Sequence, residues 1–146
     1  MAWGTAKPQG LPTIVKTVSD ADVTVTAGSD ITVFTPSAAL VAPYEGGWAY
    51  MVWVYATVVM GSSASAALVV KLKTATPTTL DTWTVPPANL VNSAIIPLSI
   101  NLVGTTSGNL YFPTGDTPVV TFNATTNNAT VKAGSRAVFA FWPATD

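Results

Sequence analysis

Cysteine and histidine are both absent from this chain. Without cysteine there can be no disulfide, no thiolate zinc site and no thiol nucleophile. Without histidine, the commonest general base and the commonest metal ligand are missing. The two absences remove most familiar catalytic designs, and we therefore expect a protein that is not an enzyme and needs no cofactor.

Charged residues are also scarce. They make up 9% of the 146 residues, against about 25% in an ordinary soluble domain, and six basic and seven acidic side chains leave a net charge of −1. No basic cluster is present, so direct binding of nucleic acid is not expected. A surface with so few charges needs another cover, either a membrane or a set of partner subunits.

A membrane does not fit the apolar runs of this sequence. The longest extends from Trp48 to Met60, is broken only by Thr57, and is shorter than the roughly 20 residues of a spanning helix. Residues 1–8 contain no apolar segment typical of a secretory signal, so we expect the product to stay in the compartment where it is made. Partner subunits are therefore the expected cover.

The seven acidic residues are scattered along the chain and form no recognisable catalytic pair. Asp20 and Asp22 flank Ala21 beside an expected turn, where acidic side chains commonly bond to the backbone. A calcium site built from these two carboxylates and a neighbouring carbonyl is chemically allowed, but the turn role is the simpler interpretation. We therefore expect no metal site.

The residue pattern is typical of β-structure. Valine and threonine are frequent, and no long segment has helical periodicity. Leu68, Val70 and Leu72 point to one side of an expected strand, while Lys71 and Lys73 point to the other, as on a strand with one solvated face. Short strands separated by Gly, Pro and Ser turns predict an all-β fold: an antiparallel β-sandwich, a single jelly roll of about eight strands.

Local signals mark one strand edge and two turns. Pro97 interrupts an alternating strand and so places that strand at a sheet edge or at a bulge. The hexapeptide at residues 24–29, which ends in Ala-Gly-Ser, matches residues 130–135. Since glycine supplies positive φ in tight turns, we expect a hairpin turn at each Ala-Gly-Ser, the second joining residues 129–132 to residues 136–142.

The first residues of the chain differ from the rest. Residues 1–12 contain two glycines and two prolines but few apolar side chains, which favours an extended N-terminal arm ahead of one domain over residues 13–146. Trp3 is unusual in a free arm. It either packs back on its own domain or anchors the arm on a neighbouring subunit.

Two segments, Trp48–Met60 and residues 137–142, are apolar on both faces of the expected strand. A sandwich strand normally has one solvated face. Because no helix is expected to cover the second face, a neighbouring subunit is the natural cover. The predicted subunit interface consists of Trp3, Trp48, Tyr50, Met51, Trp53, Tyr55, Phe139, Phe141 and Trp142.

The order of these features resembles that of the small single jelly-roll virion proteins of bacteriophages, which include capsid decoration (cement) proteins and small coat proteins. The resemblance covers roughly residues 13–142 and rests on strand pattern, turn chemistry and composition. It implies a structural virion protein without catalytic residues that forms a homo-oligomer, a trimer being favoured, and contacts other capsid proteins. The same resemblance implies assembly in the host cytoplasm and stabilisation of the shell through apolar subunit contacts.

A second interpretation is a carbohydrate-binding β-sandwich module of a phage fibre or a cell-surface protein. Exposed aromatic rings can stack on sugars, and Tyr44, Trp83 and Tyr111 lie in or beside expected loops. Such a module would differ from a shell protein by a saturable affinity for a glycan.

Overall fold

The computed structural model describes residues 7–8, 13–36, 48–61, 67–74, 79–85, 93, 95–102 and 117–145; residues 7, 8, 13, 48–50, 74 and 141–145 are described by their backbone alone. No helix occurs among these residues, and hence none that is long and apolar enough to cross a membrane. The strands are β1 (Lys7–Pro8), β2 (Thr13–Val18), β3 (Val23–Val25), β4 (Ile31–Phe34), β5 (Trp48–Met60), β6 (Leu68–Thr74), β7 (Thr79–Val85), β8 (Ile95–Leu102), β9 (Pro118–Ala124), β10 (Ala129–Val131) and β11 (Arg136–Thr145).

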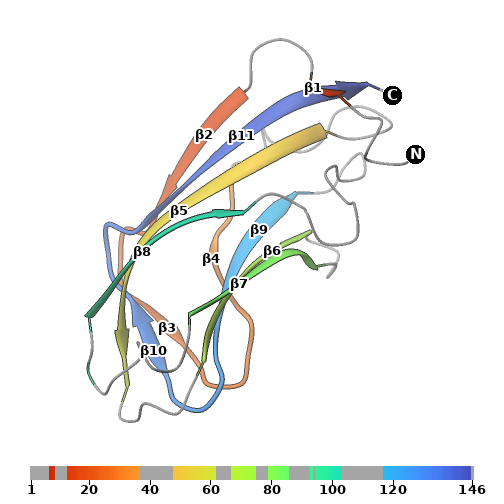
Figure 1. Cartoon of the computed structure of the whole chain (residues 1–146). Helices are drawn as coiled ribbons and strands as arrows, with labels where there is room; N and C mark the ends of the chain where they lie inside the picture. The colour runs from red at the N-terminus through yellow and green to blue at the C-terminus, as the bar shows by residue number, and fades with distance from the viewer. Residues whose placement is uncertain are drawn as a thin grey trace.

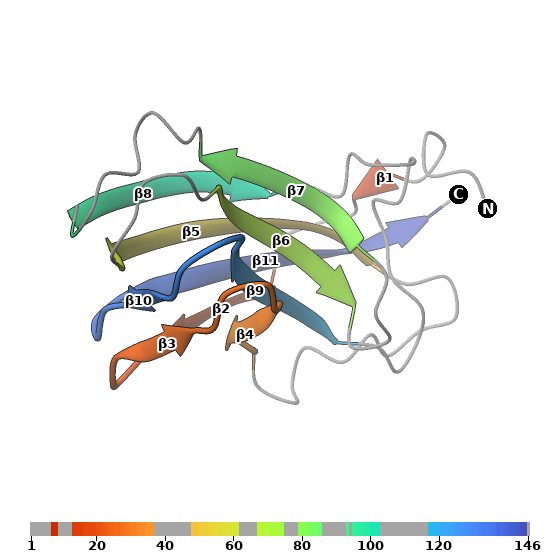
Figure 2. The same ribbon diagram turned by 90° about the horizontal axis from the view of Figure 1, so that it is seen from below.

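The strands form two sheets that face each other as the layers of a sandwich (Figures 1 and 2). The larger sheet holds β1, β2, β3, β5, β8, β10 and β11, and the smaller sheet has the order β4–β9–β6–β7. Every strand pair that the structure describes is antiparallel. The expected all-β antiparallel sandwich is confirmed.

Two long strands of the larger sheet are each interrupted once. β11 and β10 lie one after the other along the same edge of β5 and both pair with it. On their far side, β2 pairs with β11 and β3 pairs with β10. β8 pairs with the other edge of β5. If each interrupted strand is counted once, the sheet orders are (β2, β3)–(β10, β11)–β5–β8 and β4–β9–β6–β7, which is the eight-stranded connectivity of a jelly roll.

The expected N-terminal arm is described only at β1. There Lys7 and Pro8 pair with Thr145 and Ala144 at the end of β11, in the same chain. Figure 1 shows this short pairing beside the C-terminus. The rest of the arm, including Trp3, lies outside the described residues, so its role as a tether between subunits stays a prediction.

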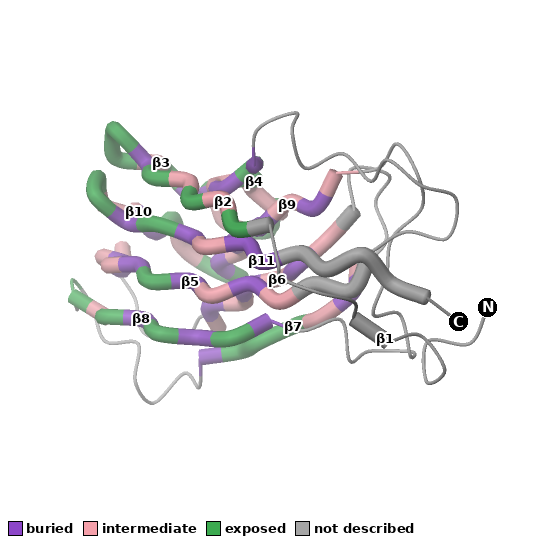
Figure 3. Tube along the Cα trace, turned by 90° about the horizontal axis from the view of Figure 1, so that it is seen from above, coloured by how far each residue is buried: buried purple, intermediate pink, exposed green. Residues whose placement is uncertain are grey.

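The core lies between the two sheets and follows from strand alternation. In β5 every second residue from Val52 to Met60 is at most 5% exposed. Leu68, Val70 and Leu72 of β6 face these residues and have no exposed area, on the side of the strand where alternation placed them. Figure 3 shows the same alternation of buried and more exposed positions along β5 and β8.

β8 is an edge strand in the described part of the larger sheet, as Pro97 indicated. Thr57 of β5, which lies opposite Pro97, directs its backbone to the other side: its N–H donates to Ser135 Oγ at 3.1 Å, and its carbonyl accepts the Lys132 N–H at 2.8 Å. Because both backbone groups of a strand residue point to one side, Thr57 and Pro97 form a pair without backbone hydrogen bonds. The donor that proline lacks is therefore not needed there.

Both Ala-Gly-Ser segments form β-turns of the same type. The φ angle is +76° at Gly28 and +86° at Gly134, and the alanine before each glycine has a negative φ. In each turn the serine N–H donates to the carbonyl three residues earlier, over 3.2 Å. A negative φ followed by a positive φ at the two central positions defines a type II turn, which requires glycine at the second of them.

The expected hairpins at these turns are wrong. The first turn leads from β3 in the larger sheet to β4 in the smaller sheet, and the second lies between β10 and β11, which follow each other along one edge of β5. Tight hairpins favour turns with positive φ at the first central position, because only these match the strand twist. Alanine occupies that position here with a negative φ, so each turn redirects the chain without pairing its flanking strands.

Candidate interaction surface

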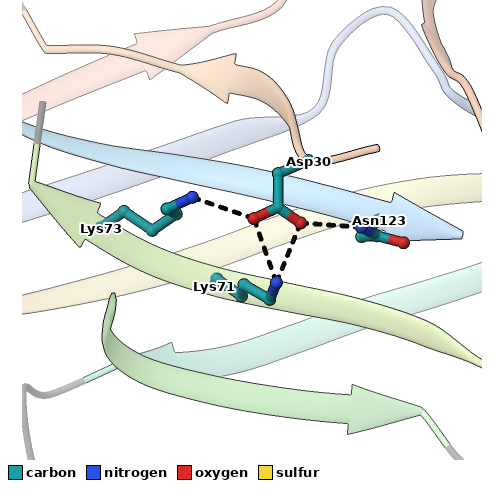
Figure 4. Close-up of polar contacts among 4 residues, drawn as sticks. All are labelled: Asp30, Lys71, Lys73 and Asn123. Atoms are coloured by element: carbon teal, nitrogen blue, oxygen red, sulfur yellow. Dashed lines mark hydrogen bonds and ion pairs between the residues drawn. The ribbon is translucent and has the colours of Figure 1, made fainter. Parts of the chain in front are cut away.

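The outer face of the smaller sheet carries charges that are paired within the chain. Asp30, just before β4, accepts hydrogen bonds from Lys71 Nζ at 2.9 and 3.0 Å, from Lys73 Nζ at 2.9 Å and from Asn123 Nδ2 at 2.8 Å (Figure 4). Partial burial acts to raise the pKa of Asp30, but the hydrogen bonds from Asn123 and the two lysines outweigh it and hold this pKa well below its ordinary value. The cluster ties β4 to β9 and β6.

The outer face of the larger sheet has a different character. Its outward side chains, here called the outer large-sheet face, are Ile14, Lys16 and Val18 of β2; Thr24 of β3; Met51, Trp53, Tyr55, Thr57 and Val59 of β5; Ile95, Pro97, Ser99 and Asn101 of β8; Thr130 of β10; and Arg136, Val138 and the almost fully buried Ala140 of β11. Ile95 and Ile14 are 70% and 62% exposed, and Val18 and Tyr55 are 40% and 38% exposed. Solvated sheet faces normally carry polar side chains at such positions, so this face is the candidate interaction surface.

The strand register joins these side chains into rows that cross the sheet. The rows are Ile14, Ala140 and Met51; Lys16, Val138, Trp53 and Asn101; and Val18, Arg136, Tyr55 and Ser99. Apolar groups from β2, β11 and β5 adjoin one another in the first row, and Val138 adjoins Trp53 in the second. Lys16 and Arg136 lie beside these groups, and the polar side chains Ser99 and Asn101 lie on β8. The face therefore combines neighbouring apolar groups with a few polar ones.

The larger sheet is interrupted at one level, where β2 gives way to β3 and β10 to β11. Ser19 N–H donates to the Ser135 carbonyl, and Gly134 N–H donates to the Ser19 carbonyl, both over 2.8 Å. Ser135 Oγ accepts the Thr57 N–H, and Ser135 is only 4% exposed. The serine hydroxyl thereby replaces the backbone acceptor that an uninterrupted strand would offer to β5.

Asp22 stabilises this interruption from the β3 side. Its carboxylate accepts hydrogen bonds from Lys132 Nζ and from the Ala133 N–H, the latter at 2.9 Å. The hydrogen bond from Lys132, followed by that from Ala133, lowers the pKa of Asp22. The carboxylate therefore bonds to the backbone of a turn, as expected, but this turn is the distant one at residues 132–135 and not the one beside Ala21. Within the described ranges, no three His, Cys, Asp or Glu side chains gather as a metal ion would require.

A surface cavity of about 290 Å³ opens beside the interruption, on the outer large-sheet face. Its wall includes Tyr55, Thr57, Pro97, Ser135 and Arg136, which β5, β8 and the start of β11 bring together. The guanidinium carbon of Arg136 lies 5.1 Å from the centre of the Tyr55 ring, within the range of a cation–π interaction. The cavity therefore combines one cation, hydroxyl groups and an apolar wall.

The structure brings three of the predicted interface residues, Met51, Trp53 and Tyr55, to the outer large-sheet face. Phe139 requires a correction: it pairs with Val52 on the inner side of the larger sheet and is fully buried in the core, so no partner can contact it. The further predicted residues Trp48 and Tyr50 of β5 and Phe141 and Trp142 of β11 are described by their backbone only. Trp3 lies outside the described residues.

Sequence reasoning missed Ile14, Val18 and Ile95, which are more exposed than any predicted interface residue whose exposure is described. Alternation in their short strands shows which residues share a face, but not which strand each one adjoins. Of the aromatic residues considered for sugar binding, Trp83 is 37% exposed on β7, and Tyr44 and Tyr111 lie outside the described residues.

Known structures resemble this fold, although the sequence matches no protein-family model and no curated protein. Eiger TNF from S. frugiperda matches with 15% identity and a TM-score of 0.51, over 94% of this chain and 97% of that chain. FLHE matches with 16% identity and a TM-score of 0.48, over 92% and 99%. The infectious bursal disease virus VP2 subviral particle matches with 14% identity and a TM-score of 0.43, over 90% of this chain and 37% of that chain. At these identities the likeness shows the β-sandwich fold alone.

Proposed function

We propose that the protein is a structural virion subunit, a capsid decoration (cement) or small coat protein, which holds neighbouring subunits through the outer large-sheet face. One observation carries the proposal: Ile14, Val18 and Ile95 are exposed together with aromatic side chains on a sheet face without a cover in the described chain. Full burial of one such aliphatic side chain contributes about 1.5–3 kcal/mol. A partner that covers the face gains several contributions of this kind.

The size of the face suits a protein partner. Four strands about 4.8 Å apart, followed for about 30 Å from Met51 to Val59, give roughly 600 Å² of sheet. Stable interfaces bury about 600–1,000 Å² on each partner. Contact over this face alone reaches the lower end of that range, and an arm formed by residues 1–12 would add to it.

The composition of the face also supports a protein partner. Trp53, Tyr55, Met51 and Arg136 belong to the residue types that are enriched in the buried centres of protein interfaces. They lie within two adjacent strands, β5 and β11, so a single partner can contact all four. The charged cluster around Asp30 occupies the opposite side of the sandwich and does not interfere.

Ile95→Lys tests the proposal, with Thr84→Lys as its matched control on the outer face of the smaller sheet. Both positions are exposed, so each variant should fold and melt much as the wild type does. Light scattering over a range of concentrations should show an oligomeric wild type, an Ile95→Lys variant that associates about tenfold more weakly, and an unchanged control. A wild type that stays monomeric at high micromolar concentration and enters no particle would show that the proposal is wrong, and so would equal effects of the two variants.

A further inference from the structure

The cavity beside the interruption contains groups that have no partner within the described chain. The Arg136 guanidinium contacts the Tyr55 ring but forms no hydrogen bond or ion pair among the described residues. The Ser135 hydroxyl accepts the Thr57 N–H, yet its own O–H has no acceptor within the ranges that the structure describes, and Ser135 is 96% buried at the wall of the cavity. Two hydrogen-bond donors, one of them cationic, therefore line the same small space.

We propose that this cavity binds the carboxylate of an acidic side chain, carried by a partner protein that packs on the outer large-sheet face. The inference rests on the proposed function and deepens it, because it names the chemistry by which the partner is recognised. A carboxylate has two oxygens that match the fork of a guanidinium group. It also accepts a hydrogen bond from a hydroxyl group, as the donor left in Ser135 requires.

The size of the cavity favours a side chain over a larger ligand. Its volume of about 290 Å³ lies just below the range of roughly 300–1,000 Å³ that is typical of small-molecule sites. Pro97 and the Tyr55 ring provide an apolar wall against which the aliphatic stem of a glutamate can pack. With one cation in its wall, the cavity suits a single negative charge better than a phosphate group.

The charge of the surrounding face points to the same partner. The outer face of the larger sheet carries the cations Lys16, Lys132 and Arg136 and one carboxylate, Asp22, among the described residues. Asp22 is paired with Lys132, so Lys16 and Arg136 are left without an ion-pair partner in the described chain. A second copy packed on this face about a twofold axis near Arg136 would bring like charges together. A partner protein that offers acidic side chains instead complements the face.

The hydrogen bonds around the interruption hold the cavity in shape. Both backbone groups of Thr57 are bonded across it, to Ser135 Oγ and to the Lys132 N–H. Ser19 and Gly134 close the other side. The Ser135 hydroxyl is therefore positioned before a ligand arrives, and the Arg136 guanidinium is held only by its contact with the Tyr55 ring. Prior positioning of a donor lowers the entropy lost on binding.

The test is an NMR titration of the ¹⁵N-labelled full chain, below the concentration at which it associates, with N-acetyl-glutamic acid α-amide. The matched neutral probe is N-acetyl-glutamine amide, and glucuronate tests an acidic sugar. We expect saturable amide shifts at Thr57, Ser135 and Arg136, with a dissociation constant of the order of 1 mM. Arg136→Gln should weaken binding about tenfold or more, whereas Lys16→Gln, which removes a cation of the same face outside the cavity, should leave it unchanged.

Several results would overturn the inference: no saturable shift, an equal response to the glutamine probe, or equal losses in Arg136→Gln and Lys16→Gln. Preferential binding of glucuronate would also overturn it, since the cavity would then serve an acidic sugar. The inference and the proposed function fail separately. If the chain associates through Ile95 but does not bind the glutamate probe, only the carboxylate site is wrong. If it binds the probe but never associates, the proposed function is wrong.

Discussion

Asp30→Asn removes the charge that holds the polar cluster of the smaller sheet together. The carboxylate accepts four hydrogen bonds of 2.8–3.0 Å, and its side chain is 21% exposed, beside 26% for Lys71 and 17% for Lys73. Hydrogen bonds to charged groups contribute about 1.5–3 kcal/mol each, whereas exposed ion pairs contribute at most about 1 kcal/mol. Asparagine keeps one acceptor but leaves two partly buried lysines without a counter-charge.

We therefore expect Asp30→Asn to lower the free energy of unfolding by about 2–3 kcal/mol, which for a chain of this size lowers Tm by roughly 4–12 °C. Asp20→Asn, at an exposed carboxylate between β2 and β3, is the control and should stay within about 0.5 kcal/mol of the wild type. Urea unfolding at neutral pH measures both. A loss below about 0.5 kcal/mol in Asp30→Asn would show that the four hydrogen bonds of this carboxylate do not stabilise the fold as expected.

The same cluster fixes the sign of a pH effect. The pKa of Asp30 is lower in the folded chain than in the unfolded chain, where it is about 3.9. The ionised carboxylate therefore contributes its full stability above about pH 4, and this contribution is lost as pH falls through the lower folded-state pKa. Wild-type stability should fall below about pH 4 more steeply than that of Asp30→Asn. An equal fall in the free energy of unfolding with decreasing pH in the two proteins would show that protonation of Asp30 does not weaken the cluster.

Three further substitutions test the packing. Thr121→Val should raise the free energy of unfolding by about 1 kcal/mol in urea titration, because the buried Thr121 Oγ1 has no hydrogen-bond partner among the described residues; destabilisation would mean that the hydroxyl is satisfied. Gly61→Ala should cost about 1–3 kcal/mol by the same assay, because a Cβ there would collide with the Asn128 carbonyl oxygen; an unchanged midpoint would argue against this close approach. Val54→Asp should prevent folding, seen as loss of a cooperative melt, because Val54 has no exposed area and a charge there would be unpaired; a folded variant would contradict the assigned core.

Alternation and turn chemistry in the sequence predicted the fold class and several local features. The apolar side of residues 68–73 is the buried side, Gly28 and Gly134 have positive φ, and Pro97 lies in an edge strand. Each of these features depends on residues close together in the chain. Local sequence is sufficient for them because strand parity and turn geometry are set within a few residues.

Features that depend on strand pairing were not predictable in the same way. Trp48–Met60 is apolar on both sides, and only its pairing shows that Val52 faces the core and Trp53 faces outward. Phe139 follows Val52 to the inner side through the same register. Lys73 was expected to be solvated, but it is paired with Asp30, 43 residues away. The local sequence pattern cannot predict a contact over such a separation.

The claim that a protein partner covers the outer large-sheet face can be measured directly, because the chain has no cysteine of its own. Ser99→Cys places a single thiol on this face, and Thr84→Cys places one on the outer face of the smaller sheet; both positions are exposed in the isolated chain. The rate of maleimide labelling would be compared between the assembled and the dissociated protein. We expect assembly to slow labelling at position 99 about tenfold or more, since interface centres exclude solvent, and to leave position 84 unchanged. Equal labelling of position 99 in both states, or protection of position 84 alone, would show that no partner covers this face.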